Sequence, residues 1–189
     1  MNADTRTQII SKADFLIRTR GYAAFSYADL AEHLGITKAS IHYHFRSKED
    51  LVAELVQESM ARFEQILEGV KQDTPGAKAR LRAYADLFLK GFEAGMLPLC
   101  GALAAERDAL PEKVRPMIID YFQIHRRWIR EVAETGKAAG EIRLALPSEQ
   151  FALMIVSVLE GGSFVGWAYE KKELVLAAFE SVLDLIEEI

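Results

Sequence analysis

Residues 37–48 carry a run of hydrogen-bonding side chains, in the order Thr-Lys-Ala-Ser-Ile-His-Tyr-His-Phe-Arg-Ser-Lys. Hydroxyl, imidazole and ammonium groups on one short helix suit the edges of nucleic-acid bases and the nearby phosphates. Metal binding is the alternative chemistry for the histidines. However, His42 and His44 lie two residues apart, about 200° around a helix axis, and cannot easily share an ion. We therefore expect no metal site at this run.

The surrounding residues predict the elements that position these side chains. Ser26 is a good N-cap for a first short helix, and the charge of Asp29 suits the dipole of its first turn. Gly35 can end that helix in the left-handed conformation, and Thr37 caps a second helix. The second helix buries one apolar face and directs its polar residues elsewhere. This arrangement is a helix-turn-helix, whose second helix lies in the major groove of DNA.

The end of the second helix resembles the DNA-binding domain of the TetR family of transcriptional regulators. That family typically places a hydrophobic residue, two aromatics, His and Phe at this point, followed by a Lys that opens the next helix. The sequence matches this pattern at Ile41, Tyr43, His44, Phe45 and Lys48. It departs at His42, where the first aromatic residue of the family is usually Tyr. The resemblance is close over residues 5–50, and elsewhere it extends only to length and helical pattern.

The resemblance implies an all-α protein, with a three-helix helix-turn-helix domain over residues 1–48 and a helical effector-binding and dimerisation domain over residues 49–189. It favours a repressor that a small, largely apolar ligand releases from a pseudo-palindromic operator, although activators share the fold. Base edges or nearby phosphates are assigned to one set of side chains, namely Thr37, Lys38, Ser40 and His42. The DNA backbone is assigned to a second set, namely Ser26, Tyr43, His44 and Lys48.

The distribution of charge agrees with this reading. The chain of 189 residues has a formal net charge of −5. Residues 1–50 hold seven Lys and Arg against six Asp and Glu, whereas residues 51–189 hold sixteen against twenty-two. The acidic surplus therefore lies away from the predicted DNA-binding segment. Because the basic excess is modest, we expect affinity to depend on two copies acting together.

Composition excludes several other classes of protein. Half of the residues are apolar, so general disorder is excluded. There is no signal-peptide pattern or uninterrupted apolar span, and the single cysteine fits a reducing compartment. We expect a cytoplasmic protein without a membrane span. There is no Gly-rich phosphate loop, nucleophile elbow or His-Glu-x-x-His motif. We therefore expect no cofactor and no catalytic site, with an all-helical enzyme as a minor alternative.

The apolar periodicity predicts about nine helices and no strand. Besides the two helices of the motif, these are expected at residues 5–21, 47–70, 77–93, 99–108, 112–138, 148–169 and 171–188. The helix at 47–70 links the DNA-binding segment to the rest of the chain, so we expect an effector to act by moving it.

The segment 151–169 is apolar on every side of its helix, so it must be covered on more than one face. A second copy of the chain is the expected cover, with Gly161, Gly162 and Gly166 allowing two backbones to approach. The alternative is a central core helix. We predict a homodimer through residues 148–188, which also suits paired recognition helices on two half-sites.

Aromatic residues on three helices are dense enough to line an apolar cavity. Each one taken alone is more often ordinary core. The predicted ligand-binding residues are Phe88, Phe92, Cys100, Tyr121, His125, Trp128 and Met154. Cys100 could instead be a modification site, because it starts a helix whose dipole would lower its pKa, or simply an inert small hydrophobe. Control by a protein partner is a further alternative.

Overall fold

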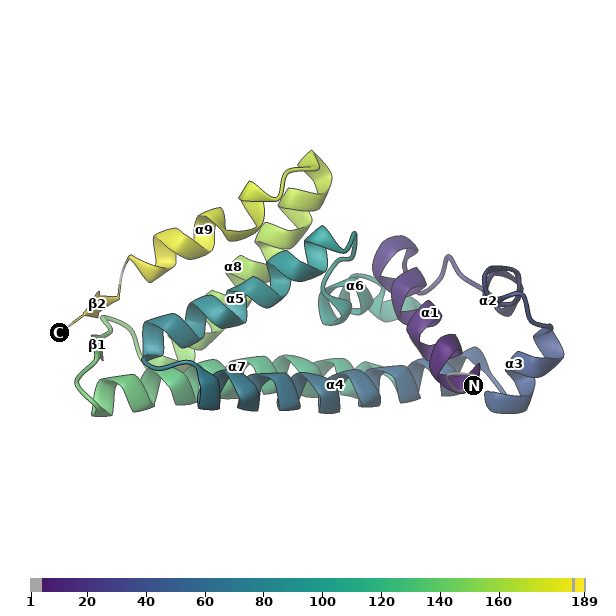
Figure 1. Ribbon diagram of the computed structural model, residues 1–189, viewed down its shortest axis with the longest axis horizontal. Coiled ribbons are helices and arrows are strands. Elements are labelled where there is room, and N and C mark those ends of the chain that lie inside the picture. Colours follow the sequence, from purple (N-terminus) through teal and green to yellow (C-terminus); the bar gives the residue numbers. More distant parts are fainter. Residues whose placement is uncertain (1–4, 185, 189) are drawn as a thin grey trace. The chain divides into compact units, whose positions relative to one another are not determined.

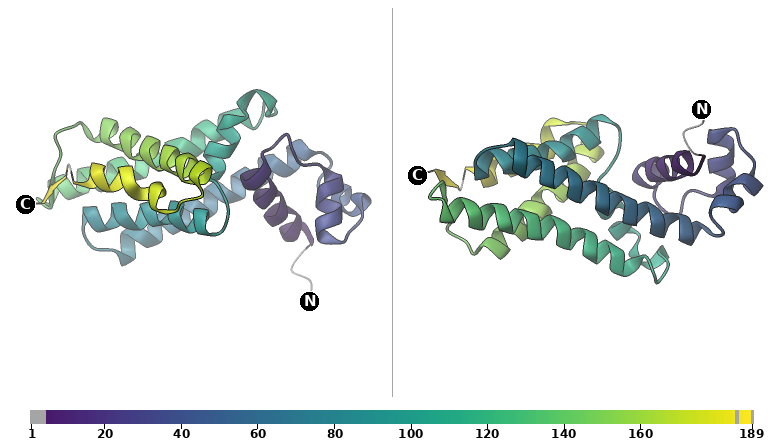
Figure 2. Two further views of the ribbon diagram at one scale, coloured as in Figure 1. Left: turned by 90° about the horizontal axis from the view of Figure 1, so that it is seen from above. Right: turned by 60° about the horizontal axis from the view of Figure 1, so that its bottom comes forward.

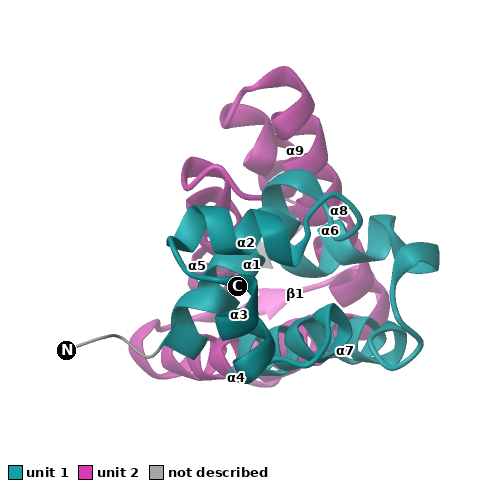
Figure 3. Ribbon diagram, turned by 90° about the vertical axis from the view of Figure 1, so that its right-hand side faces the viewer, with its two compact units in different colours: residues 1–61, 99–121 teal, residues 62–98, 122–189 magenta. Residues whose placement is uncertain are grey.

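The computed structural model describes residues 5–184 and 186–188 (Figure 1). Contacts divide the chain into unit 1, residues 1–61 and 99–121, and unit 2, residues 62–98 and 122–189 (Figure 3). The described residues form nine α-helices: α1 Thr5–Arg20, α2 Tyr27–Leu34, α3 Lys38–His44, α4 Lys48–Asp73, α5 Ala77–Glu93, α6 Leu99–Ala105, α7 Arg115–Ala138, α8 Ser148–Tyr169 and α9 Glu173–Leu183. They also form a 3-10 turn, η1 Arg107–Ala109, and two short strands, β1 Ile142–Arg143 and β2 Glu187–Glu188. The all-α fold expected from the sequence is confirmed.

Unit 1 is built around α1, which packs on α2, α3 and α6. Its core is apolar and comes from segments far apart in the chain: Ile9, Ala13, Leu16, Ile17, Leu30, Ile41, Phe45, Leu51, Leu55 and Leu103 are all at most 2% exposed. The helix-turn-helix therefore shares its core with α6, which follows it by more than fifty residues. The predicted domain over residues 1–48 begins with four residues that lie outside the described ones.

Unit 2 is a bundle in which α8 packs along α9, and α5 contacts both (Figure 2). Phe151, Ile155 and Leu159 on α8 and Val175 and Phe179 on α9 are at most 2% exposed. On each helix these residues recur every four positions, the spacing of one helix face.

Several helices differ in extent from the prediction, and α4 runs to Asp73 instead of ending near residue 70. The helix predicted at 112–138 begins instead at Arg115, after a turn in which the amides of Val114 and Arg115 donate to Pro111 O. Pro116 explains the later start, because proline lacks an amide donor and fits only the first turn of a helix. The helix predicted at 99–108 ends at Ala105, and the 3-10 turn η1 follows it.

The expectation that the chain has no strand was wrong. α9 ends at Leu183 rather than at 188, and Glu187–Glu188 pairs antiparallel with Ile142–Arg143, which lies between the helices predicted at 112–138 and 148–169. A ladder of two residues has no periodic pattern that a sequence could reveal. Residue 185, part of the predicted last helix, lies outside the described residues.

Glycines on α8 serve packing within the chain. A Cβ atom at Gly162 would lie 2.4 Å from Val175 O, and one at Gly166 would lie 2.9 Å from Val175 Cγ2. Both glycines therefore let α9 approach α8, which corrects the expectation that they serve two copies of the chain. At Gly161, by contrast, a Cβ atom would meet nothing within 4 Å.

The outward face of α8 remains apolar. Leu153 is 50% exposed, Phe164 37% and Val165 48%. By length and composition α8 could cross a membrane, but its opposite face is buried against α5 and α9. A packed helix of this kind is typical of a protein core and is only weak evidence for a membrane span.

Candidate nucleic-acid interface and the core of unit 2

The first helix of the motif, α2, has both ends fixed by local hydrogen bonds. Ser26 Oγ accepts the amides of Ala28 and Asp29, and the Asp29 carboxylate accepts the Ser26 amide at 2.7 Å and its hydroxyl at 2.6 Å. These bonds from Ser26 hold the pKa of Asp29 below its usual value. At the other end Gly35 adopts a φ of +63°, and Ile36 N donates back to Ala31 O. The Ser26 hydroxyl, predicted to contact DNA, is thus engaged in a capping box.

The second helix, α3, buries one side and exposes the other. Ile41 and Phe45 are at most 2% exposed, whereas Tyr43 is 86% exposed. Thr37 Oγ1 caps the helix by accepting the amide of Ser40 at 3.1 Å. Among the predicted base-reading residues, Lys38 and His42 are exposed and Ser40 is half-buried. Tyr43 and His44, predicted to hold the DNA backbone, contact each other edge to face with ring centroids 5.1 Å apart.

Tyr27 connects the two helices of the motif. Its hydroxyl donates to Phe45 O at 3.2 Å, and its ring packs edge-on against His42 with centroids 4.9 Å apart. Burial raises the pKa of Tyr27 to about 12, so the hydroxyl keeps its proton. Through these contacts the position of α3 depends on the start of α2. No local pattern in the sequence marks Tyr27, because its contacts with His42 and Phe45 arise only in the tertiary fold.

Lys48 is half-buried, and its ammonium binds backbone carbonyls. Nζ donates to Tyr22 O at 2.5 Å and to Phe25 O at 2.6 Å. It also lies 4.2 Å from the ring centroids of both aromatic residues, within the range of cation–π attraction. Burial lowers the pKa of Lys48, and the carboxylates of Glu106 and Asp29 partly offset this effect.

Glu106, between α6 and η1, binds the same loop from another side. Its two carboxylate oxygens accept the amides of Tyr22 at 2.7 Å and Ala23 at 2.8 Å. No local pattern in the sequence marks Glu106, since more than eighty positions separate it from its partners.

In unit 2, a buried polar pair lies inside an aromatic cluster. Tyr84 Oη and His125 Nδ1 are 2.6 Å apart, and the Phe63 ring stacks on His125 with centroids 4.4 Å apart. Trp128 stacks on Tyr84 at 5.4 Å and donates its indole N–H to Leu67 O at 3.0 Å. Burial lowers the pKa of His125 to about 3, so this imidazole is neutral near pH 7.

The structure brings together some of the predicted ligand-binding residues. Phe88, His125 and Trp128 surround Tyr84, whereas Phe92 lies edge-on to Trp167 with centroids 6.4 Å apart. Met154, on α8, is half-buried. Cys100 and Tyr121 are buried and belong to unit 1, not to unit 2. Tyr84 and Phe63 complete the cluster in unit 2, although neither was among the predicted ligand-binding residues.

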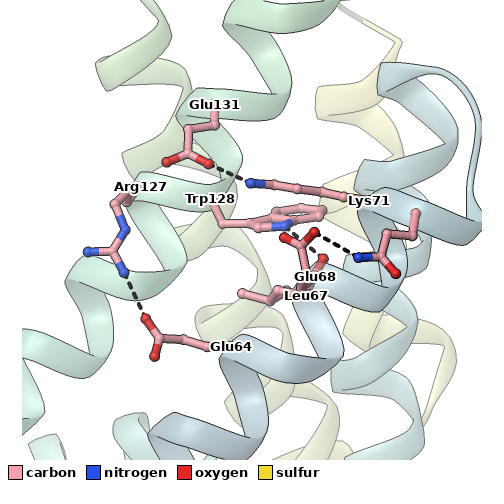
Figure 4. A network of polar contacts seen from close by, with 8 residues as sticks. Glu64, Leu67, Glu68, Lys71, Arg127, Trp128 and Glu131 are labelled. Atoms are coloured by element: carbon pink, nitrogen blue, oxygen red, sulfur yellow. Dashed lines mark hydrogen bonds and ion pairs between the residues drawn. The ribbon is translucent and has the colours of Figure 1, made fainter.

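A cavity of about 140 Å³ opens between α4 and α7 in unit 2 (Figure 4). The Glu64–Arg127 pair at 2.9 Å and the Lys71–Glu131 pair at 2.6 Å border it, and Trp128 also lines it. Trp128 is the one predicted ligand-binding residue at this cavity. Among the described residues, no group of three or more His, Cys, Asp or Glu side chains could hold a metal ion.

Two family models match separate segments of the chain. Residues 9–55 match the family model described as "Bacterial regulatory proteins, tetR family". Residues 77–181, more than half of the chain, match the model described as "Tetracyclin repressor-like, C-terminal domain".

Individual relatives agree with these family models. The HTH-type transcriptional repressor KstR2 of Mycolicibacterium smegmatis is 32% identical over 96 residues, a match that spans 49% of this chain and 43% of KstR2. A TetR-family transcriptional regulator from Agrobacterium tumefaciens superposes with a TM-score of 0.93 at 29% identity, covering 98% of this chain and 99% of that one. A TetR regulator from Legionella pneumophila gives a TM-score of 0.88 at 26% identity, with coverage of 99% and 100%.

Proposed function

Because this chain belongs to the TetR family of bacterial transcriptional regulators, we propose that it is a repressor that binds an operator in double-stranded DNA. In this proposal α3 enters the major groove and reads bases with Lys38 and His42, while Ser40 and Thr37 face nearby bases or phosphates. Ser26, Tyr43, His44 and Lys48 lie against the DNA backbone.

The exposed face of α3 is the observation that carries this proposal. Lys38, His42 and Tyr43 are exposed on a helix whose opposite face is buried by Ile41 and Phe45. A recognition helix needs this division, because one face must pack on its own domain while the other reaches base edges. The caps at Ser26, Gly35 and Thr37 fix the angle between the two helices of the motif.

The experiment is selection of bound duplexes from a random pool by the purified protein, followed by titration of the selected site by fluorescence anisotropy. Specific binding typically exceeds non-specific binding by about 10³-fold or more. We expect the selected site to be an inverted repeat with half-sites about one helical turn apart. Operator recognition would be contradicted if the selection enriched no sequence and the protein bound all duplexes with equal affinity.

A homodimer is the second part of the proposal. The outward face of α8 exposes Leu153, Phe164 and Val165, and Gly161 leaves open space beside them. Exposed apolar side chains along one side of a helix favour association, and a two-fold dimer would present two copies of α3 to one palindrome. We propose that this face of α8 contributes to the predicted interface over residues 148–188, whereas Gly162 and Gly166 pack against α9.

Control by a small, largely apolar effector is the third part. The cluster around the Tyr84–His125 pair combines aromatic side chains with two polar groups that could orient a ligand, and its Trp128 also lines the cavity between α4 and α7. A thermal-shift screen can find such a ligand, because selective binding to the native state raises the melting temperature. The effector should raise the melting temperature of the wild type but not that of Tyr84→Phe. It should also weaken operator binding by the wild type. A compound that releases DNA equally from both proteins would place the effector site elsewhere.

Two alternatives to an effector have less support. Modification of Cys100 would require access to a side chain that is 2% exposed. Control by a protein partner would leave DNA binding unaffected by every small molecule in the screen. The relatives named above are transcriptional regulators, which argues against an enzyme and favours a cytoplasmic location for this chain.

A further inference from the structure

The loop between α1 and α2 is held from two sides by opposite charges. Glu106 accepts the amides of Tyr22 and Ala23, and Lys48 donates to the carbonyls of Tyr22 and Phe25, so four backbone groups are bound within four residues. All four donor–acceptor distances lie between 2.5 and 2.8 Å. Hydrogen bonds with an ionised partner are about twice as strong as neutral ones.

Gly21 allows this contact through its backbone conformation and its lack of a side chain. It adopts a φ of +93°, a conformation that side-chain-bearing residues rarely take. A Cβ atom at this position would lie 2.0 Å from Glu106 Oε1. The loop backbone and the carboxylate can approach closely only because this side chain is absent.

The held loop leads directly into the DNA-reading helices. Phe25, 2% exposed, is followed by the N-cap Ser26 and then by Tyr27. Tyr27 contacts His42 and Phe45 O at the far end of α3. A displacement of the loop would therefore be passed to both helices of the motif, although Glu106 itself belongs to neither.

We propose that Glu106 is a positioning residue for DNA recognition, which acts together with Lys48 by fixing the α1–α2 loop. This inference rests on the proposed function, since it assigns a further residue to operator binding. Glu106 is assigned no contact with DNA, and its effect on affinity passes through the backbone of residues 22–25.

The test compares Glu106→Gln with Asp108→Asn. Each removes one negative charge and keeps the size of the side chain, but the Asp108 side chain is 100% exposed. In Glu106→Gln, one of the two accepting oxygens becomes an NH2 group, which faces a backbone N–H and cannot accept a hydrogen bond from it. We expect affinity for the selected operator to fall about tenfold or more, in line with the loss of a charge-assisted hydrogen bond. Asp108→Asn should change affinity less than about twofold.

Hydrogen exchange distinguishes positioning from a general loss of fold. The amides of Tyr22 and Ala23 should exchange faster in Glu106→Gln, while the cooperative melt of the protein is retained. In the double variant with Lys48→Met, the loss of affinity should be smaller than the two single losses combined, because both residues act on one loop.

Three outcomes would overturn the inference: operator affinity unchanged although the loop amides are released, additive losses in the double variant, or a loss of the cooperative melt in Glu106→Gln. Failure of the wild type to select any operator would contradict the proposed function instead. The exchange of the loop amides would then still report whether Glu106 holds the loop.

Discussion

Adjacent glycines on α8 should respond in opposite ways to the same added methyl group. Gly161→Ala places the methyl in open space, so it should stabilise the protein by up to about 1 kcal/mol through helix propensity. Gly162→Ala places a Cβ atom 2.4 Å from Val175 O, a backbone atom that would have to retreat by about 1 Å. Overpacking of this kind costs about 1–3 kcal/mol, which exceeds the gain in propensity. Since both variants gain the same propensity, Gly162→Ala should be less stable than Gly161→Ala by the overpacking cost, about 1–3 kcal/mol.

Urea denaturation followed by circular dichroism measures this difference. All proteins should be compared at one concentration, because an oligomer is stabilised by mass action. Gly69→Ala is a control away from α8, since a Cβ atom at this position on α4 also meets nothing within 4 Å. Equal stabilities of the Gly161 and Gly162 variants, or a Gly162 variant more stable than the wild type, would refute the assignment of Gly162 to packing between α8 and α9.

Three further predictions concern other parts of the chain. His42→Ala should change the preferred operator sequence, whereas substitution of His33, an exposed histidine on α2, by Ala should not. If His42→Ala lost the same affinity for specific and for random DNA, His42 would not read bases. Phe164→Glu should give monomers in sedimentation, whereas Ile119→Glu, at a site that is 60% exposed on α7, should leave the oligomeric state unchanged. Because the pKa of His125 is about 3 when folded and about 6.5 when unfolded, the unfolded state binds the extra proton first as pH falls. The free energy of unfolding should therefore drop by about 2 kcal/mol between pH 6.5 and 4.5, and His125→Phe should abolish this part of the pH dependence.

The sequence predicted the helix-turn-helix well because its signals are local. Ser26 and Asp29 form the expected capping box, and Gly35 takes the left-handed conformation that ends α2. Each of these features depends on residues no more than five positions apart. The spacing of residues along the sequence therefore predicts local hydrogen bonds of this type directly.

Contacts between distant segments were the part that the sequence could not predict. Glu106 reaches Tyr22 across 84 positions, and Tyr84 reaches His125 across 41. Side-chain chemistry allows these pairs, but only the packing of the helices selects them. The same limit applies to the glycines of α8. A glycine in the sequence indicates a close approach of two backbones, but it does not reveal whether the second backbone belongs to the same chain or to another copy.

Lys48 shows how a family motif can carry more than one role. The resemblance assigns this residue to the DNA backbone, and the structure engages its ammonium with two carbonyls of the α1–α2 loop. An ammonium has three donors, so one N–H beyond these two bonds can serve a phosphate. Both roles need a cation here, because loop carbonyls and phosphates alike attract positive charge. Lys48 can thus hold the loop whose position sets α2 while also contributing to the electrostatic attraction of DNA.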